Sequence, residues 1–399
     1  MSKPAVGFLK ATFQLACLGA LGLSLYSCTT RPPERGRATI QGIQGPPVVR
    51  VALGKYFPAA GNTAPVAVEG EYRVVSARSG AQLHHGTALA AGAVAADRAG
   101  GIAVGVHRFP ERDLRIVPVF DGTLKVGDRF YRGTLRAVVS DEGRLLLVNE
   151  VPLESYIAGV LGAEMPLDYP RAALEAQAVA ARTYALFEMR RADQDGRSEL
   201  WHVLDDTRSQ VYSGTLRETE KARTVVQATR GVALLSGGRL FCAYFHSTCG
   251  GHTEAADLFF DVPRMSPLAG RPCEYCGKGK WSNWEVEIPK KDIAAKLGVK
   301  DVSGLRISQK TEGIHALKVE AGGQSWNGLA FRLAVGPDRL PSTAFDVEDR
   351  GANFAFRGRG YGHGVGMCQV GTKGMAELGY DSTEILRFYY PSAELLRLY

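Results

Sequence analysis

The sequence lacks a basic cluster interleaved with aromatic side chains, the pattern that many nucleic-acid-binding surfaces show. Its 48 lysines and arginines outnumber its 41 aspartates and glutamates by only seven, and the excess is spread along 399 residues. We therefore exclude nucleic acid as a partner. A mild positive charge suits anionic polymers outside the cytoplasm, although it is equally compatible with a contribution to solubility alone.

No internal repeat of useful length is visible. The glycine-rich segment Gly358–Gly371 superficially resembles a phosphate-binding loop. It lacks the Lys-Ser/Thr pair that would open a helix, and no nucleotide-binding fold surrounds it. We therefore predict no organic cofactor. The glycines are better explained by a backbone that turns tightly and approaches a ligand or the catalytic segment.

The N-terminus carries an apolar run, Ala11–Tyr26, that is short for a membrane span. Lys3 and Lys10 precede the run, and Leu25 stands three residues before Cys28. This is the layout of a secretory signal, and its end resembles the bacterial lipoprotein cleavage box. We expect residues 1–28 to be a lipoprotein signal peptide with Cys28 as the lipidated residue, in preference to an uncleaved signal anchor.

Lipidation would place the protein in the cell envelope, anchored on the outer side of a bacterial membrane. In a Gram-negative cell this means the periplasm or outer membrane, and Thr29 in place of Asp after Cys28 fits the outer membrane. The membrane contact would be through the lipid only. Residues 29–47 are rich in Arg, Pro, Gly and Thr, which is typical of a flexible tether.

Short apolar runs punctuated by Gly, Asp and Asn fill residues 48–150 and predict β-strands and hairpins. Residues 151–192 have a helical pattern apart from a proline break, and strands and short helices alternate after them. Lys290–Leu297 and Lys373–Leu378 are expected to be helices. We predict an α+β fold in which a β-rich N-terminal region, 48–150, leads into a mixed helix and strand catalytic domain, 151–399, with a substrate groove.

Glu164 lies beside the proline break, just before an alanine-rich helix expected over Ala172–Phe187. Pro166 and Pro170 would hold it on a stiff connection between two helical segments. A carboxyl placed there would be well oriented, and partial burial would raise its pKa toward that of a general acid. On local pattern alone, however, a Glu before a Pro is usually a solvated loop residue.

Four ordered blocks resemble the stage II sporulation protein D family, which also contains the amidase enhancers. The resemblance extends from about Val49 to the C-terminus, and a run of four blocks is far more specific than any one. The blocks are Glu164-Met165-Pro166 with Pro170 and the helix Ala176–Ala185, then Asp206–Gly214, Phe245–Glu254 and Gly358–Gly371, closing with Ile385–Pro391.

This resemblance implies a lytic transglycosylase that cleaves the MurNAc–GlcNAc bond of peptidoglycan and leaves 1,6-anhydroMurNAc ends. The preferred substrate would be glycan strands already stripped of stem peptides by an amidase, in the course of envelope remodelling. Glu164 would be the catalytic acid and then the base. Hydrolysis stays open, because a second carboxylate could come from Asp168, Asp205, Asp206, Glu254 or Asp257.

An alternative from the same family is a non-catalytic protein that binds peptidoglycan and activates an N-acetylmuramoyl-L-alanine amidase. Retention of the whole Glu164 segment favours the enzyme. A zinc hydrolase working through His246 or His252 is a third possibility, which would require an open metal position.

Five residues of the motifs are candidates for substrate binding. Arg182 could hold lactyl or acetyl oxygens, or form a salt bridge within the protein. His363 could orient Glu164 or contact sugar, or be a buried structural histidine. Side chains that could hydrogen-bond or stack on sugar complete the set: Tyr184, Gln210 and Tyr212.

Cysteines and histidines of two blocks have the spacing of a structural zinc site. Cys249 and His252 form one close pair and Cys273 and Cys276 the other, with His246 as an alternative ligand. Three thiolates and one histidine would close a tetrahedral site. A disulfide is the competing interpretation, but the five cysteines left after the signal segment cannot all pair within one chain. In this family Cys368 usually corresponds to a serine.

Overall fold

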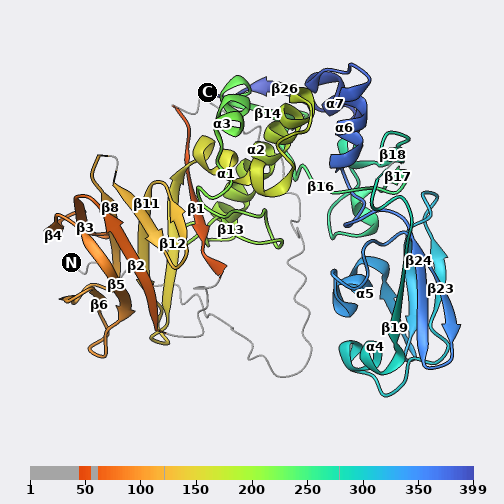
Figure 1. Ribbon diagram of the computed structural model, residues 1–399, viewed down its shortest axis with the longest axis horizontal. Coiled ribbons are helices and arrows are strands. Elements are labelled where there is room, and N and C mark those ends of the chain that lie inside the picture. The colour runs from red at the N-terminus through yellow and green to blue at the C-terminus, as the bar shows by residue number, and fades with distance from the viewer. Residues whose placement is uncertain (1–44, 55–61, 121, 278) are drawn as a thin grey trace, which may run out of the picture.

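The computed structural model describes residues 45–54, 62–120, 122–277 and 279–399 (Figure 1). The expected signal peptide, its Cys28 and all but the end of the expected tether lie outside these residues. Within the described ranges, no helix combines the length and the apolar character needed to cross a membrane. Helices and strands occur together throughout the second half of the chain, so the predicted α+β class is confirmed.

Two sheets form the N-terminal part of the chain and share one apolar core. Their strands pair antiparallel except for Val203–Leu204, which is parallel to Val48–Ala52. Their strands alternate between buried and exposed side chains, as Ala64, Val66 and Val68 do on β2. One sheet has, in order, β13 (Val203–Leu204), β1 (Val48–Ala52), β12 (Leu145–Pro152), β11 (Thr134–Val139), β8 (Asp113–Pro118), β3 (Tyr72–Ser76) and β4 (Gln82–Gly86). The other has β10 (Arg129–Tyr131), β9 (Thr123–Val126), β2 (Thr63–Glu69), β5 (Leu89–Ala96), β6 (Ile102–Val104) and β7 (His107–Phe109).

Smaller sheets make up the rest of the strand content. Two of them, with α4 and α5, enclose a separate apolar core at the right of Figure 1. These are β19 (Trp284–Pro289), β24 (Asn353–Gly358) and β23 (Phe345–Arg350), and β20 (Arg306–Lys310), β21 (Ala316–Ala321) and β22 (Gln324–Asn327). The others are β15 (Arg239–Leu240), β14 (Val232–Ser236) and β26 (Glu394–Arg397), the parallel pair β16 (Phe245–His246) and β25 (Met367–Cys368), and β17 (His252–Thr253) with β18 (Arg271–Pro272).

The helices expected over residues 151–192, 290–297 and 373–378 are present, and the helices over residues 220–228, 328–335 and 382–389 were not predicted. The helices of the described part are α1 (Leu153–Glu164), α2 (Arg171–Gln194), α3 (Glu220–Ala228), α4 (Lys290–Leu297), α5 (Gly328–Val335), α6 (Gln369–Glu377) and α7 (Ser382–Tyr389). The proline break falls between α1 and α2 as expected, because Pro166 and Pro170 cannot donate a backbone hydrogen bond. The last expected helix begins earlier than predicted, at Gln369, where the Cys368 side chain caps it.

Helix α2 lies at the centre of the second half and contacts α1, α3, α6, α7 and β14. Its alanines Ala173, Ala176 and Ala180 are fully buried, and their small side chains allow these neighbours to approach closely. A similar close approach occurs at Gly159 of α1, where a Cβ atom would lie 2.7 Å from the Gly214 carbonyl oxygen. The end of α1 is therefore held tightly against the loop that follows β13.

A buried ion pair joins α1 to α2. Glu154 accepts hydrogen bonds from Arg182 Nε at 3.0 Å and Nη2 at 2.7 Å, and also from the Gly231 N–H and the Tyr399 hydroxyl. The remaining Arg182 donors face backbone carbonyls, including that of Val232 at 3.1 Å. Burial alone would raise the pKa of Glu154, but its hydrogen bonds and the Arg182 charge lower it overall.

We expect Arg182→Ala to reduce the free energy of unfolding by about 3–5 kcal/mol, because it would leave the Glu154 carboxylate buried without its charged partner. Urea unfolding measures this quantity. Arg190→Ala is the matched control, since Arg190 is on the same helix but half-exposed, and it should cost less than about 1 kcal/mol. Equal losses in the two variants would contradict the assignment.

Candidate active site

Glu164 is the last residue of α1, and the chain leaves the helix in an extended conformation at Met165. Its Oε1 accepts a hydrogen bond of 2.7 Å from the Val211 N–H, and the Gln369 side chain forms a second hydrogen bond with the carboxyl. Burial raises the pKa of Glu164 above its ordinary value, while the two hydrogen bonds partly offset the rise. The geometry thus gives an oriented carboxyl that retains its proton to a higher pH than a solvated one.

Two cavities meet at Glu164. The first, of about 240 Å³, is here called the Trp201 cavity and is also lined by Tyr184, Phe260 and His363. The second, of about 1020 Å³, is called the Trp281 cavity and includes the Tyr169 side chain. Aromatic side chains therefore line the cavities on both sides of the carboxyl.

Of the five candidates for substrate binding, Tyr184 and His363 line the Trp201 cavity together with Glu164. The His363 ring is held by two backbone groups: Nε2 donates to the Phe245 carbonyl at 2.9 Å, and Nδ1 accepts from the Val365 N–H at 3.1 Å. Burial lowers the pKa of His363 well below its ordinary value. This histidine is therefore a neutral, fixed wall of the cavity.

The other three candidates for substrate binding point away from the cavities. Arg182 is fully buried in its ion pair with Glu154, so its alternative interpretation as an internal salt bridge describes the structure. Gln210 accepts from the Tyr156 hydroxyl and donates to the Ala181 carbonyl. The Tyr212 hydroxyl donates to Asn149 at 3.0 Å. All their polar atoms have partners within the protein, which corrects the expectation that they contact substrate.

Two direct partners of Glu164 were not among the sequence candidates. Val211 acts through its backbone N–H, and a main-chain contact of this kind leaves no signal in residue type. Gln369 lies in the glycine-rich block, and its position next to the expected helix start was the available signal. Gln369 Nε2 is also 3.5 Å from Oε1 of the buried Gln177, so α2 and α6 together support this wall of the site.

Four buried cysteines gather beside this wall. The Sγ atoms of Cys249, Cys273, Cys276 and Cys368 all lie within 4.8 Å of one another and could hold a metal ion. No disulfide joins any of the cysteines that the structure describes. Backbone N–H groups of Cys249 and Gly371 donate to the Cys368 sulfur, each at 3.3 Å.

The structure places Cys368 where the sequence analysis expected a histidine ligand. His252 lies apart, with Nδ1 at 3.3 Å from Glu254 Oε1, and His246 Nδ1 donates to the Val365 carbonyl at 3.0 Å. Neither histidine belongs to the cysteine group. The pairing of β16 with β25 sets His246 opposite Cys368 and so brings the fourth thiol to the other three.

A close packing contact fixes the position of α6 against the cysteines. A Cβ atom on Gly371 would lie 1.9 Å from the Tyr389 hydroxyl and 3.1 Å from Cys273 Sγ. Only glycine fits at this position, and any side chain would push α6, with Gln369, away from the cluster.

Comparison with known proteins identifies the chain's relatives. A family model described as stage II sporulation protein matches residues 141–235, a range that contains α1, Glu164, α2 and Val211. Stage II sporulation protein D of Bacillus subtilis is 30% identical over 274 residues, covering 62% of this chain and 75% of that protein. An uncharacterised protein of Brachyspira hyodysenteriae is 32% identical over 280 residues, covering 69% and 74%.

A third relative, the amidase enhancer of Bacillus subtilis, is 28% identical over 292 residues, which span 60% of this chain but 40% of that longer protein. The four motif blocks, the family model and the extended identity to stage II sporulation protein D lead to the same assignment. The chain belongs to the stage II sporulation protein D family.

Proposed function

We propose that this protein is a peptidoglycan lytic transglycosylase that cleaves the MurNAc–GlcNAc bond with Glu164 as acid and then base. Membership of the family connects the chain with the cell wall and its processing. The observation that carries the finer proposal is the single oriented carboxyl, with a raised pKa, at the junction of two cavities. A glycan strand could cross Glu164 with sugars bound on both sides.

In this reaction Glu164 donates its proton to the glycosidic oxygen as the bond from that oxygen to C1 of MurNAc breaks. The same carboxylate then accepts the proton of the C6 hydroxyl while that oxygen forms a bond to C1. The products are a free GlcNAc hydroxyl and a 1,6-anhydro ring, and no water is consumed. Because Oε1 already accepts the Val211 N–H, we expect the other oxygen to carry the transferable proton.

The other carboxylates near Glu164 give little support for hydrolysis, which would need a second acidic group. None of the five candidates for that group lines either cavity of the described chain. Glu188 does line the Trp201 cavity, but Arg191 and Arg197 each form an ion pair with it at 3.0 Å. Glu274 and Glu377 line the Trp281 cavity, but both are exposed and Glu377 pairs with Lys373, which favours attack by the sugar's own C6 hydroxyl.

We further propose that the chain works outside the cytoplasm, anchored by a lipid on Cys28. Residues 29–47 would be the tether, residues 48–150 an N-terminal β-rich domain, and residues 151–399 the catalytic domain. By analogy with the amidase enhancer, a cell-wall amidase is the partner that would supply peptide-stripped strands.

The cysteine cluster has the chemistry of a structural zinc site. Four sulfurs around zinc at about 2.3 Å would form a tetrahedron with edges of about 3.8 Å, which agrees with thiols that all lie within 4.8 Å. We propose Cys249, Cys273, Cys276 and Cys368 as the ligands. A bound ion would link three segments of the chain and support Gln369 through its neighbour Cys368, without an open position for catalysis.

Glu164→Gln should abolish formation of 1,6-anhydroMurNAc ends from peptide-stripped strands, since a general acid contributes about 10²–10⁴-fold to such a reaction. Mass spectrometry of the soluble products measures this. Glu274→Gln, an exposed carboxylate of the Trp281 cavity, is the matched control and should remain active.

Products with reducing ends in place of anhydro ends would show that the reaction is hydrolysis and not transglycosylation. If neither the parent nor the control releases products, yet both increase the activity of a cell-wall amidase, the non-catalytic activator would be the correct function.

The raised pKa of Glu164 predicts a pH-dependent effect on stability. The folded state binds this proton more tightly than the unfolded chain, so the contribution is present below the unfolded pKa and is lost as pH rises through the folded pKa. Glu164→Gln should therefore melt at a higher temperature than the parent at about pH 7.5, and the difference should vanish near pH 4. Thermal unfolding at both pH values tests this, with Glu274→Gln expected to show no difference.

One zinc ion per chain should be found by elemental analysis of protein purified without chelator. Cys368→Ser should lose most of it and lower the melting temperature, because thiolate ligands are needed to close the site. Cys242→Ser is the control for removal of a buried thiol outside the cluster and should keep its zinc. Full zinc content in Cys368→Ser would show that another residue completes the site.

A further inference from the structure

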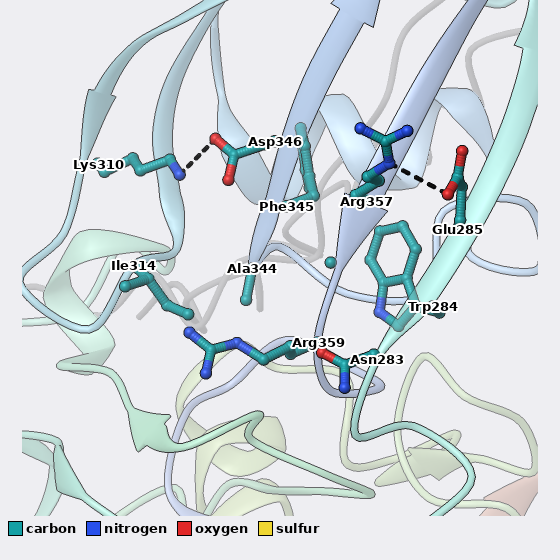
Figure 2. A pocket seen from close by; sticks show the side chains of 11 residues that line it. Asn283, Trp284, Glu285, Lys310, Ile314, Ala344, Phe345, Asp346, Arg357 and Arg359 are labelled. Carbon is teal, nitrogen blue, oxygen red and sulfur yellow. Dashed lines mark hydrogen bonds and ion pairs between the residues drawn. The ribbon is translucent and has the colours of Figure 1, made fainter.

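A third cavity lies outside the site described above. It has a volume of about 480 Å³, within the range of about 300–1,000 Å³ that ligand pockets show. Strands β19, β23 and β24, the end of β20 and the turn before β21 form its walls, and we call it the Arg359 cavity (Figure 2). Glu164 does not line it, so it has no part in the bond cleavage itself.

The charged side chains that line the Arg359 cavity form two ion pairs and leave one further cation, Arg359. Lys310 pairs with Asp346 at 2.6 Å, and Arg357 Nε lies 3.1 Å from Glu285. Figure 2 shows both pairs on one side of the cavity and the Arg359 side chain extending across the other. Within the described ranges no carboxylate lies within ion-pair distance of this exposed guanidinium. The cavity is therefore suited to a single negative charge.

The groups around Arg359 are held in place. Trp284 Nε1 donates to the Gly360 carbonyl at 3.0 Å, which fixes an aromatic face on the cavity wall. Ile314 on the opposite wall has a φ of 74°, a strained conformation for a β-branched residue. Its turn is anchored by the Thr311 hydroxyl, which donates to Glu254 at 2.8 Å. Strain retained in a rigid wall is typical of binding sites.

An aromatic ridge of two residues links the Trp281 cavity to the Arg359 cavity. Trp281 lines the former and Tyr361 follows Arg359 by two residues, and their ring centroids are 4.5 Å apart with the planes inclined by 33°. The Gly360 N–H donates to the Trp281 carbonyl at 2.7 Å, and the Tyr361 N–H donates to the carbonyl of Thr248, which lines the Trp281 cavity. A chain that leaves Glu164 through the Trp281 cavity would meet this aromatic ridge and then Arg359.

From these observations we infer that the Arg359 cavity is a remote subsite that binds the lactyl carboxylate of a muramic acid residue on a peptide-stripped glycan strand. The inference rests on the proposed function, because it takes the strand across Glu164 as given. Removal of the stem peptide leaves one free carboxylate on every second sugar, and a guanidinium matches a carboxylate with two parallel hydrogen bonds. Asn283 and Trp284 would contact the sugar that carries it. The subsite makes long, peptide-stripped strands the preferred substrate.

Binding measured without turnover tests the inference. In a Glu164→Gln background, Arg359→Ala should weaken the affinity for long peptide-stripped strands about tenfold, as loss of a partly exposed charge-assisted hydrogen bond would. The affinity for chitooligosaccharides of the same length, which carry no carboxylate, should not change. Arg306→Ala removes an exposed arginine on β20 away from the cavity and is the matched control.

Equal affinity of the Arg359→Ala and Arg306→Ala proteins for the long strands would overturn the subsite, whatever products the enzyme forms. An equal loss for strands and chitooligosaccharides would also overturn it, because the carboxylate would then play no part. If the parent enzyme makes no anhydro ends but the selective loss is found, the proposed reaction fails and the subsite stands.

Discussion

The position of the Glu164 carboxyl depends on the buried ion pair between Glu154 and Arg182. Glu154 lies near the start of α1 and Glu164 at its end. An ion pair that fixes the start of this helix therefore also orients the residue at its end. The pair also connects to Gly231 and Tyr399, and through them to the small sheet of β14 and β26. An arginine suits this position because its planar group directs five donors to separate acceptors, which a lysine cannot do.

Much of the fold and one central residue of the site could be predicted from the sequence. Alternating apolar strands, the proline break and the alanine-rich helix leave strong local signals, and Glu164 was identified from them with the family blocks. The direction of polar side chains was harder to predict. Alanines occur on every face of α2, so no apolar stripe indicates which face is buried, and Arg182 gave no sign that it points inward. The side chains of Gln210 and Tyr212 also point inward, whereas the backbone N–H of Val211 between them faces Glu164.

The cysteine cluster shows a second limit of inference from sequence. Spacing arguments detect ligands that are close along the chain, and Cys249, Cys273 and Cys276 were found in this way. The fourth member, Cys368, joins them through the parallel pairing of β16 and β25, which are separated by the sheets around β19 and β21. A long-range contact of this kind has no local pattern. A nearby histidine was therefore predicted as the fourth ligand in place of Cys368.

The same strand pairing has a consequence for the timing of activity. Chains emerge from synthesis N-terminus first, and a non-local pairing cannot form before its second strand exists. Helix α1 and its carboxyl are synthesised long before α6 supplies Gln369 and the loop before β25 supplies His363 to the cavity walls. A partly synthesised chain therefore contains Glu164 but lacks the residues that complete the two cavities. Under the proposed function, a protein that cuts the polymer enclosing its own cell would become active only after its C-terminal residues had been synthesised.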